Sequence, residues 1–360
     1  MKKLDLYISK KFISTFFIAL LLIIGIVIIF DISEKIDDFV QNQVPLKSII
    51  MDYYVNWIPY FVNMFSPLFV FITVIFFTSR MAANSEFIAM LSGGISYARI
   101  LLPYVACAIL IAGLSLGLNL YVIPKSNVER TDFEQKYVHS SHSKTNLRNV
   151  HYQISPGEFV YVESFSRWNN TAYKFTLETI RDGRLVSKLE ADSAVWDSTK
   201  DCWRLRNWFI RDYSAGLEDR LTSGEKKDTS IALTVTDFYR NNKTVETLPI
   251  GQLNQLIETQ KMRGDANVMF AEIEKNNRYA LPFSAIILTI MGVCLSSRKK
   301  RGGIGWNLAL GIGLAFSYIL FMRFSQMFVY TDTLPPALAL WTPNILYALI
   351  TVILYIKAQK

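Results

Sequence analysis

The sequence predicts an α-helical membrane protein with six transmembrane helices and an inserted all-β domain of open jelly-roll-like type. Three observations lead to this fold class. The chain has 360 residues, of which 51% are hydrophobic, and these gather into six long apolar runs. A polar segment with strand-like alternation separates the first three runs from the last three. Lysine and arginine concentrate in the short loops of one side.

Each apolar run has about 20 residues, the length that crosses a ~30 Å hydrocarbon layer as a helix. The first three runs contain no charged residue, and the fifth contains only Arg323. The first run is expected to be retained, because it is too long for a signal-peptide core and no small-x-small cleavage site follows it. The six expected spans are 12–30, 58–79, 100–123, 279–297, 304–330 and 334–356.

The short loops differ in charge, which predicts the orientation. Basic residues occupy the N-terminus, the loop after the second span, the loop 298–303 and the C-terminus, whereas the loops after the first and fifth spans are acidic or neutral. Both termini are therefore expected in the cytoplasm, with 124–278 on the outer side. Because this topology explains part of the formal net charge of +8, no nucleic-acid partner is expected.

The outer segment is expected to form β-structure. Apolar and polar residues alternate over 157–165 and 174–180, as in strands with one buried face. The Asp-Gly pair within 181–184 predicts a hairpin turn, since both residues tolerate positive φ. A second hairpin is expected around "STKD" (198–201), and one more strand over 229–238. Several short strands with intervening turns favour an antiparallel sandwich or an open jelly roll.

Two parts of this segment have a distinct pattern. Alternation over 203–211 predicts Trp203, Leu205 and Phe209 on one face and Trp208 and Ile210 on the other, as in a central strand or one that meets an apolar ligand. Later, Leu253, Leu256 and Ile257 have helical spacing. The predicted domains are helices one to three (1–123), the β-domain (124–248), a helical connector (249–278) and helices four to six (279–360).

The sequence favours no enzyme, cofactor or metal site. It lacks H-E-x-x-H, G-x-S-x-G and the P-loop motif, so ATP binding would need another chain. His139 and His142 are three residues apart and His151 is near, but a surface position is favoured over a metal site. Cys107 and Cys294 fall within spans and Cys202 stands alone, so no disulfide framework is expected.

Charges near the membrane are more informative, because a charge within a span needs a partner or water. Arg323 lies about 18 residues into its span, near the outer boundary at a rise of ~1.5 Å per residue. It either snorkels to the interface or faces an anionic lipid or substrate. Lys35 has a similar height beside Asp31 and Glu34, where an ordinary interfacial charge is equally compatible.

The stretch "RMAANSEFIAMLSGGISYAR" (80–99) separates the second and third spans. Asn84 or Ser85 is expected to cap a short helix over about 84–93, with Glu86 in its first turn. Phe87, Met90 and Leu91 would share one face, and Gly93 or Gly94 would end the helix in the left-handed conformation. A helix lying on lipid is the alternative, but an exposed carboxylate suits a docking surface for a cytoplasmic protein better.

Several segments resemble the family of lipopolysaccharide export permeases, LptF/LptG (YjgP/YjgQ), and their order spans nearly the whole chain. They are "NSEFIAMLSGGIS", "YISKKFISTFF", "FDISEKIDDF", "NVHYQISPGEFVYVESF", "LEADSAVWD", "WRLRNWFIRDY", "NRYALPFSAIILTIMGVCLSSRKKRGG" and "LPPALALWTPNIL". The resemblance implies a permease subunit in the bacterial inner membrane with a periplasmic β-domain. Its implied partners are a dimeric cytoplasmic ABC ATPase, a second permease of the same type, periplasmic bridge proteins of β-jelly-roll fold, and lipopolysaccharide.

The resemblance also implies functional residues. Glu86 matches the coupling-helix carboxylate that meets the ATPase, and Ser85, Met90 and Gly93 are expected contacts beside it. Some members carry a lysine cluster after the first helix for lipid phosphates, but only Lys35 is present here, among four acids. Lipid contacts are therefore expected at Lys35 and Arg323, with apolar surface from phenylalanines of spans one and five, among them Phe316, Phe321 and Phe324.

Three other functions remain open from sequence. An ABC permease for another lipid or a lipoprotein has a similar composition, although lipoprotein-release permeases usually carry the outer domain after the first span. A membrane sensor or scaffold with an outer β-domain needs no ATPase and no role for Glu86. A secondary transporter ranks lowest, because coupling-ion acids at mid-membrane are absent from the predicted spans.

Overall fold

The computed structural model describes residues 3–138, 147–166, 168–213, 220–231, 233–239, 245–262, 267–298 and 303–359. The chain divides into two compact units. The helical unit comprises Met1–Tyr137, Thr247–Ile250 and Glu272–Lys360, and the sheet unit comprises Val138–Glu246 and Gly251–Ala271. Of the residues used in the sequence analysis, those that lie outside the described residues are His139, His142, 299–302 of the basic loop, and the terminal lysines 2 and 360 that contribute to the basic termini.

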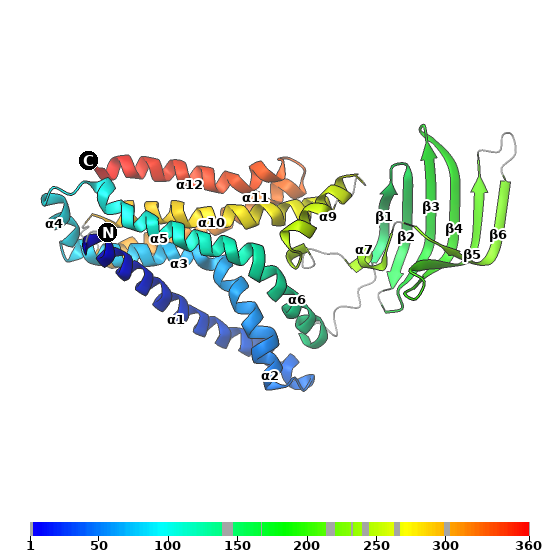
Figure 1. Cartoon of the computed structure of the whole chain (residues 1–360), viewed down its shortest axis with the longest axis horizontal. Coiled ribbons are helices and arrows are strands. Elements are labelled where there is room, and N and C mark those ends of the chain that lie inside the picture. The colour runs from blue at the N-terminus through cyan, green and yellow to red at the C-terminus, as the bar shows by residue number, and fades with distance from the viewer. Residues whose placement is uncertain are drawn as a thin grey trace. The chain divides into compact units, whose positions relative to one another are not determined.

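The helical unit consists of long helices with short connections (Figure 1). Turns of π-helix at Ile49–Tyr54, Leu118–Val122 and Glu134–Val138 extend three of the helices without a break. The helices are α1 (Lys3–Gln41), α2 (Leu46–Ser48), α3 (Val55–Ala83), α4 (Glu86–Ser92), α5 (Tyr97–Gly117), α6 (Ile123–Phe133), α10 (Val268–Ser296), α11 (Gly303–Tyr330) and α12 (Pro336–Gln359).

Six helices of the described chain are long and apolar enough to cross a membrane, which confirms the predicted class. They are Lys3–Gln41, Leu46–Ala83, Tyr97–Val138, Val268–Ser296, Gly305–Tyr330 and Pro336–Ala358. Several extend beyond the predicted apolar runs, because polar turns continue the same helix past the hydrocarbon length. The helix that holds the third span, for example, continues through Val138.

Helix α3 is the packing centre of the helical unit, with contacts to α1, α5, α6 and α11. A glycine on α11 permits one of these contacts, since a Cβ at Gly311 would collide with the Ile75 side chain. Buried amides join the helices: Asn63 Nδ2 donates to Asn119 Oδ1 at 2.7 Å, and Asn307 Nδ2 donates to Ser79 Oγ at 3.2 Å. Such bonds satisfy polar groups where hydrocarbon offers none.

The sheet unit contains one antiparallel sheet in the sequential order β1 to β6 (Figure 1). Both predicted hairpins are confirmed, since Arg181 pairs with Arg184 and Asp197 pairs with Cys202 at their turns. The strands are β1 (Leu147–Ser155), β2 (Glu158–Ser166), β3 (Thr171–Arg181), β4 (Arg184–Asp197), β5 (Cys202–Asp212) and β6 (Arg220–Thr229). Two helices complete the unit, α7 (Val235–Tyr239) and α9 (Ile250–Met262), the second within the predicted connector.

The strand predicted over 229–238 is wrong. Strand β6 ends at Thr229, and the chain then forms α7 over one face of the sheet. The carboxylate of Asp237 accepts hydrogen bonds from the Thr234 backbone N–H at 2.9 Å and its hydroxyl at 3.1 Å, a capping arrangement that starts a helix. Phe238 thereby packs into the apolar core of the sheet.

The predicted faces of β5 are also wrong in part. Trp203 and Leu205 are buried in the sheet core, and Trp208 and Ile210 pack against the same core from the same face. The reason is Asn207, whose φ of 48° interrupts the alternation. The apolar side chains before Asn207 and those after it therefore point to one face, and strict two-residue periodicity does not hold across this residue. Phe209 is instead 36% exposed.

Candidate functional site

The short helix α4 follows directly from how α3 ends and α5 begins. Ser85 has φ 63°, and its side chain makes no capping hydrogen bond, so the predicted side-chain N-cap is wrong. The left-handed Ser85 reverses the chain instead. Gly94, with φ 79°, ends α4 as predicted: its N–H donates to Leu91 O at 3.0 Å, and Ile95 N–H donates to Met90 O at 3.2 Å. These two bonds make a Schellman motif.

The carboxylate of Glu86 contacts the first turns of α1. Tyr7 Oη donates to Glu86 Oε2 at 3.0 Å, and Lys11 Nζ lies 3.9 Å from Glu86 Oε1 while it donates to Tyr7 Oη at 2.7 Å. Asn84 Nδ2 donates to Oε1 at 3.3 Å. The side chain of Glu86 nevertheless keeps 31% of its surface exposed. It is thus held within the chain and remains accessible from outside.

Helix α4 is anchored by one apolar side chain. Phe87 is 1% exposed and joins the core that contains Ile8 and Phe12 of α1. Met90 packs against the same core, whereas Ile88 and Leu91 are 48% and 41% exposed. The predicted shared face is therefore wrong for Leu91, which lies on the outward surface although Phe87 and Met90 pack inward. Ile88, which the sequence analysis did not single out, lies on the same outward surface, and its i, i+3 spacing from Leu91 was the available signal.

A half-buried ion pair lies beside α4. Arg99, in the first turn of α5, approaches Asp5 of α1 with NH1 2.7 Å from Oδ1 and NH2 2.8 Å from Oδ2. The side chain of Asp5 is only 8% exposed. Sequence analysis missed this pair, because the residues are 94 positions apart and each alone resembles an ordinary charge beside a predicted span.

The whole chain was compared with known proteins. A family model described as "Lipopolysaccharide export system permease LptF/LptG" matches residues 6–357. The chain belongs to the LptF/LptG family. No match was found among curated proteins. The permease is therefore a transport subunit and, with its six apolar helices, a multi-pass protein of the inner membrane.

Lys35 of the permease is not a free cation. Its ammonium lies 2.7 Å from Asp31 Oδ1, one helical turn earlier, and also contacts the hydroxyl of Tyr53. Tyr54 Oη donates to the other carboxylate oxygen of Asp31 at 3.0 Å. The side chains of Lys35 and Asp31 are 18% and 12% exposed. The positive charge is thus neutralised within the chain, which weakens the expected lipid contact at Lys35.

Arg323 of α11 has a different environment. Its guanidinium contacts the sulfur of Met64 at 3.8 Å, and no carboxylate of the described residues pairs with it. Phe316 and Phe324 on the same helix are 58% and 61% exposed, whereas Phe321 packs partly into a core shared by α3, α10 and α12. Arg323, Phe316 and Phe324 therefore offer an accessible charge within apolar surface, and Phe321 contributes less.

The described residues contain no group of three or more histidine, cysteine, aspartate or glutamate side chains that could hold a metal ion. His151 lies on β1 and packs its ring on Tyr161, with centroids 4.6 Å apart. Cys107, Cys202 and Cys294 are buried free thiols.

Proposed function

We propose that the chain is the permease subunit of an ABC transporter that extracts lipopolysaccharide from the inner membrane and passes it to a periplasmic bridge. ATP hydrolysis would occur in a separate dimeric ATPase in the cytoplasm. The observation that carries the proposal is α4: a short helix between two spans, anchored by buried Phe87, with Glu86 accessible and Ile88 and Leu91 exposed. An apolar patch beside a carboxylate suits a protein partner better than an anionic lipid surface.

The proposed ATPase contact comprises Ser85, Glu86, Met90 and Gly93, with Ile88 added from its exposure. Ser85 and Gly93 are exposed and Met90 is half-buried, so they supply backbone and apolar contacts around the carboxylate. Because Glu86 is already held by Tyr7 and Lys11, a basic residue of the ATPase would have to share or replace that contact. An exposed ion pair of this kind contributes only about 0.2–1 kcal/mol.

The proposed lipid and permease contacts lie on α1 and α11. In the 18-residue apolar stretch of each helix, only 22% is buried in α1 and 28% in α11, against 61% in the helices that contain α3 and α10. A second permease and the acyl chains of a lipid are the apolar partners that a transporter of this family would bring to these faces. Arg323 supports an anionic headgroup in this proposal, whereas Lys35 contributes little because Asp31 neutralises it.

In the proposed topology both termini are cytoplasmic and residues 124–278 are periplasmic. The charge distribution of the loops supports this orientation. The apolar face of the six-stranded sheet would shield acyl chains from water, and bridge proteins of similar β-fold would continue that shielding. Strand pairing at a sheet edge is the contact mode that such partners commonly use.

Co-purification from the native membrane tests the proposal. The native chain would be compared with Glu86→Ala, Glu86→Arg and the matched control Glu34→Arg, which makes the same exchange at an exposed site near the other end of α1. Bound proteins and lipids would be identified by mass spectrometry. We expect Glu86→Ala to weaken ATPase binding by up to about fivefold, and Glu86→Arg to weaken it more, because like charges then meet.

The outcomes separate the candidate functions. Recovery of an ATPase, a second permease and lipid A-type molecules with the native chain and with Glu34→Arg supports the proposal. Recovery of the ATPase with a different lipid or a lipoprotein favours a permease for that substrate. If the native chain recovers no ATPase in a detergent that keeps related complexes intact, the coupling role of α4 fails and a sensor or scaffold function leads.

A further inference from the structure

The first turns of α1 contact both ends of the segment that carries α4. At the first residue of α4, Tyr7 and Lys11 hold Glu86. After α4, Asp5 holds Arg99 in the first turn of α5 by two contacts of 2.7 and 2.8 Å. Asp5 and Tyr7 lie within one turn at the start of α1 and Lys11 lies one turn later, so α1 is joined to this segment at two points.

The two contacts differ in strength. The Asp5–Arg99 pair is charge-assisted and bidentate by distance, and the NH2–Oδ2 contact is a hydrogen bond. The Asp5 side chain is 8% exposed and that of Arg99 33%, and the planar guanidinium restricts the direction of the contact. The Lys11–Glu86 pair is longer, at 3.9 Å, and both side chains are 31% exposed, so it is weak and exchangeable. Glu86 can therefore leave Lys11 for another cation while Asp5 and Arg99 stay together.

Through its middle, α1 is held by an apolar stripe, with Ile13, Ile23 and Ile28 half-buried beside it. Near its far end Phe39 is buried, and Lys35 and Asp31 contact Tyr53 and Tyr54. The buried residues of the stripe recur every four positions. They are Ile8, Phe12, Phe16, Leu20 and Ile24. A helix attached along one stripe and anchored near its far end can tilt about that end with little repacking, provided that something at its first turns drives it.

We propose that Asp5 and Arg99 are positioning residues that transmit displacement of the α4 segment into α1, while Tyr7 and Lys11 hold Glu86 in the resting position. The inference rests on the proposed function, since the displacing force would come from the ATPase. In the resting chain Lys11 occupies the place that a cation of the ATPase takes on docking. The movement then passes through the Asp5–Arg99 pair into the span with the least buried apolar surface of the six described.

The experiment uses the complete transporter in lipid bilayers, with three readouts: ATPase retained, ATP hydrolysed, and lipid extracted per ATP. Asp5→Asn breaks the charge pair, Asp5→Glu conserves the carboxylate, and Asp37→Asn is the control, an exposed acid on the same helix. A spin label at Leu21→Cys reports movement of α1, and one at Leu349→Cys on α12 serves as reference. Both positions are well exposed, at 67% and 59%.

We expect Asp5→Asn to retain the ATPase but to lower lipid extracted per ATP by roughly five- to tenfold, the size of a typical coupling between sites. Its label at position 21 should lose the nucleotide-dependent change that the native chain shows. Asp5→Glu should recover most of both, and Asp37→Asn should match the native chain. Should Asp5→Asn fail to fold, Arg99→Lys replaces it, because it keeps the charge and loses the bidentate geometry.

Three results would overturn the inference. Native extraction per ATP by Asp5→Asn would show that the pair transmits nothing, and so would a native-like response of its label. Loss of the ATPase from Asp5→Asn but not from Asp5→Glu would show a merely structural role. If the native chain itself binds no ATPase, the proposed function fails first, and that outcome is distinct from normal ATPase binding with normal extraction by Asp5→Asn.

Discussion

The polar contacts within the helical unit and those within the sheet unit differ in how far apart their residues are in the sequence. In the helical unit, several contacts join residues that are far apart in the sequence and wholly or partly buried. Asp5 and Arg99 are 94 positions apart, and Ser79 and Asn307 are 228 apart. These segments meet only after the helices have formed and packed, so each contact depends on the assembly of the whole unit.

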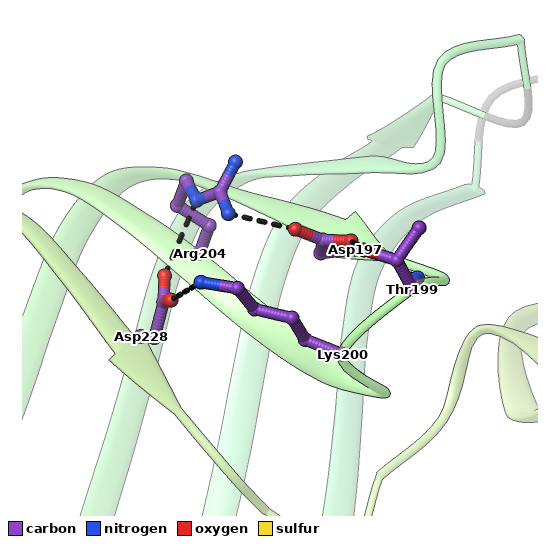
Figure 2. Close-up of polar contacts among 5 residues, drawn as sticks. All are labelled: Asp197, Thr199, Lys200, Arg204 and Asp228. Carbon is purple, nitrogen blue, oxygen red and sulfur yellow. Dashed lines mark hydrogen bonds and ion pairs between the residues drawn. The ribbon is translucent and has the colours of Figure 1, made fainter.

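In the sheet unit, the ion pairs between described residues lie within a strand or join neighbouring strands and their turns, at the surface of the sheet. Figure 2 shows Arg204 between two carboxylates, with Asp197 Oδ2 2.7 Å away and Asp228 Oδ1 3.2 Å away. Lys200 reaches Asp228 at 3.1 Å, and the Thr199 hydroxyl donates to Asp197 at 2.6 Å. Every one of these residues lies in β4, β5, β6 or the turn between β4 and β5.

This difference predicts where a single substitution should destabilise the protein most. A buried charge that loses its partner cannot recover the lost interaction from water. An exposed charge on the sheet can, so its partner is worth little. We therefore expect perturbations of the helical unit to be larger than perturbations of the sheet surface, and three substitution experiments measure this ranking.

The largest effect is expected at Arg278 of α10. Its side chain is 3% exposed, with Nε 2.7 Å from Glu274 Oε1 and NH1 2.8 Å from the Leu248 carbonyl. Arg278→Met leaves the carboxylate and the carbonyl without these donors, at a cost of about 3–5 kcal/mol. The measurement is thermal unfolding of the purified chain in mild detergent, followed by loss of helical circular dichroism.

A double substitution separates the effect of the unpaired charge from the effect of lost packing. Arg278→Met/Glu274→Leu removes both charges, so we expect it to be more stable than Arg278→Met alone by at least ~1 kcal/mol. If the double variant is no more stable than the single one, the unpaired carboxylate is not the cause. The proposed contrast between the two units would then lose its physical basis.

Composition alone predicts the helical unit well. Runs of about 20 apolar residues must span the membrane as helices, because hydrocarbon leaves no other partner for the backbone. The sheet followed from alternation and turn residues, and both hairpins are confirmed at Arg181–Arg184 and Asp197–Cys202. Where the prediction fails, one residue changes the backbone: Asn207 shifts the faces of β5, and Asp237 starts α7.

The sequence predicted only part of the candidate site. Glu86 and the end of α4 at Gly94 have local signals, a carboxylate in the first turn and a glycine after the last. Asp5, Tyr7 and Arg99 carry no local signal, because their role depends on how α1 packs beside α5. The neutralisation of Lys35 by Asp31 has a local signal, the i, i+4 spacing, that an isolated count of charges overlooks.

An intermediate effect is expected at Asn207, which tests the local character of the sheet. Its φ of 48° is tolerated by asparagine and glycine and opposed by β-branched residues. Asn207→Val should destabilise the sheet unit by about 1–2 kcal/mol, whereas Asn207→Gly should be close to neutral. Tryptophan fluorescence during chemical denaturation measures both. Equal losses in the two variants would assign the effect to the hydrogen bond from Asn207 to Asp192 at 3.0 Å and not to the backbone.

The smallest effect is expected from acid on the exposed cluster of Figure 2. Hydrogen bonds from Thr199 and the charge of Arg204 lower the pKa of Asp197, and contacts from Lys200 and Arg204 lower the pKa of Asp228. A carboxyl whose pKa is lower in the folded chain stabilises it above the unfolded pKa, and the stabilisation is lost as the pH falls through the folded pKa. The loss should therefore begin below about pH 4.

Asp228→Asn should flatten this pH dependence of the denaturation midpoint, while Glu163→Gln, an exposed carboxyl on β2, should leave it unchanged. The shift should be smaller than either change described above, because water screens every member of the cluster. A midpoint that falls as steeply in Asp228→Asn as in the native chain would assign the acid sensitivity to other carboxyls. A loss as large as that of Arg278→Met would contradict the ranking itself, since an exposed local contact would then matter as much as a buried one.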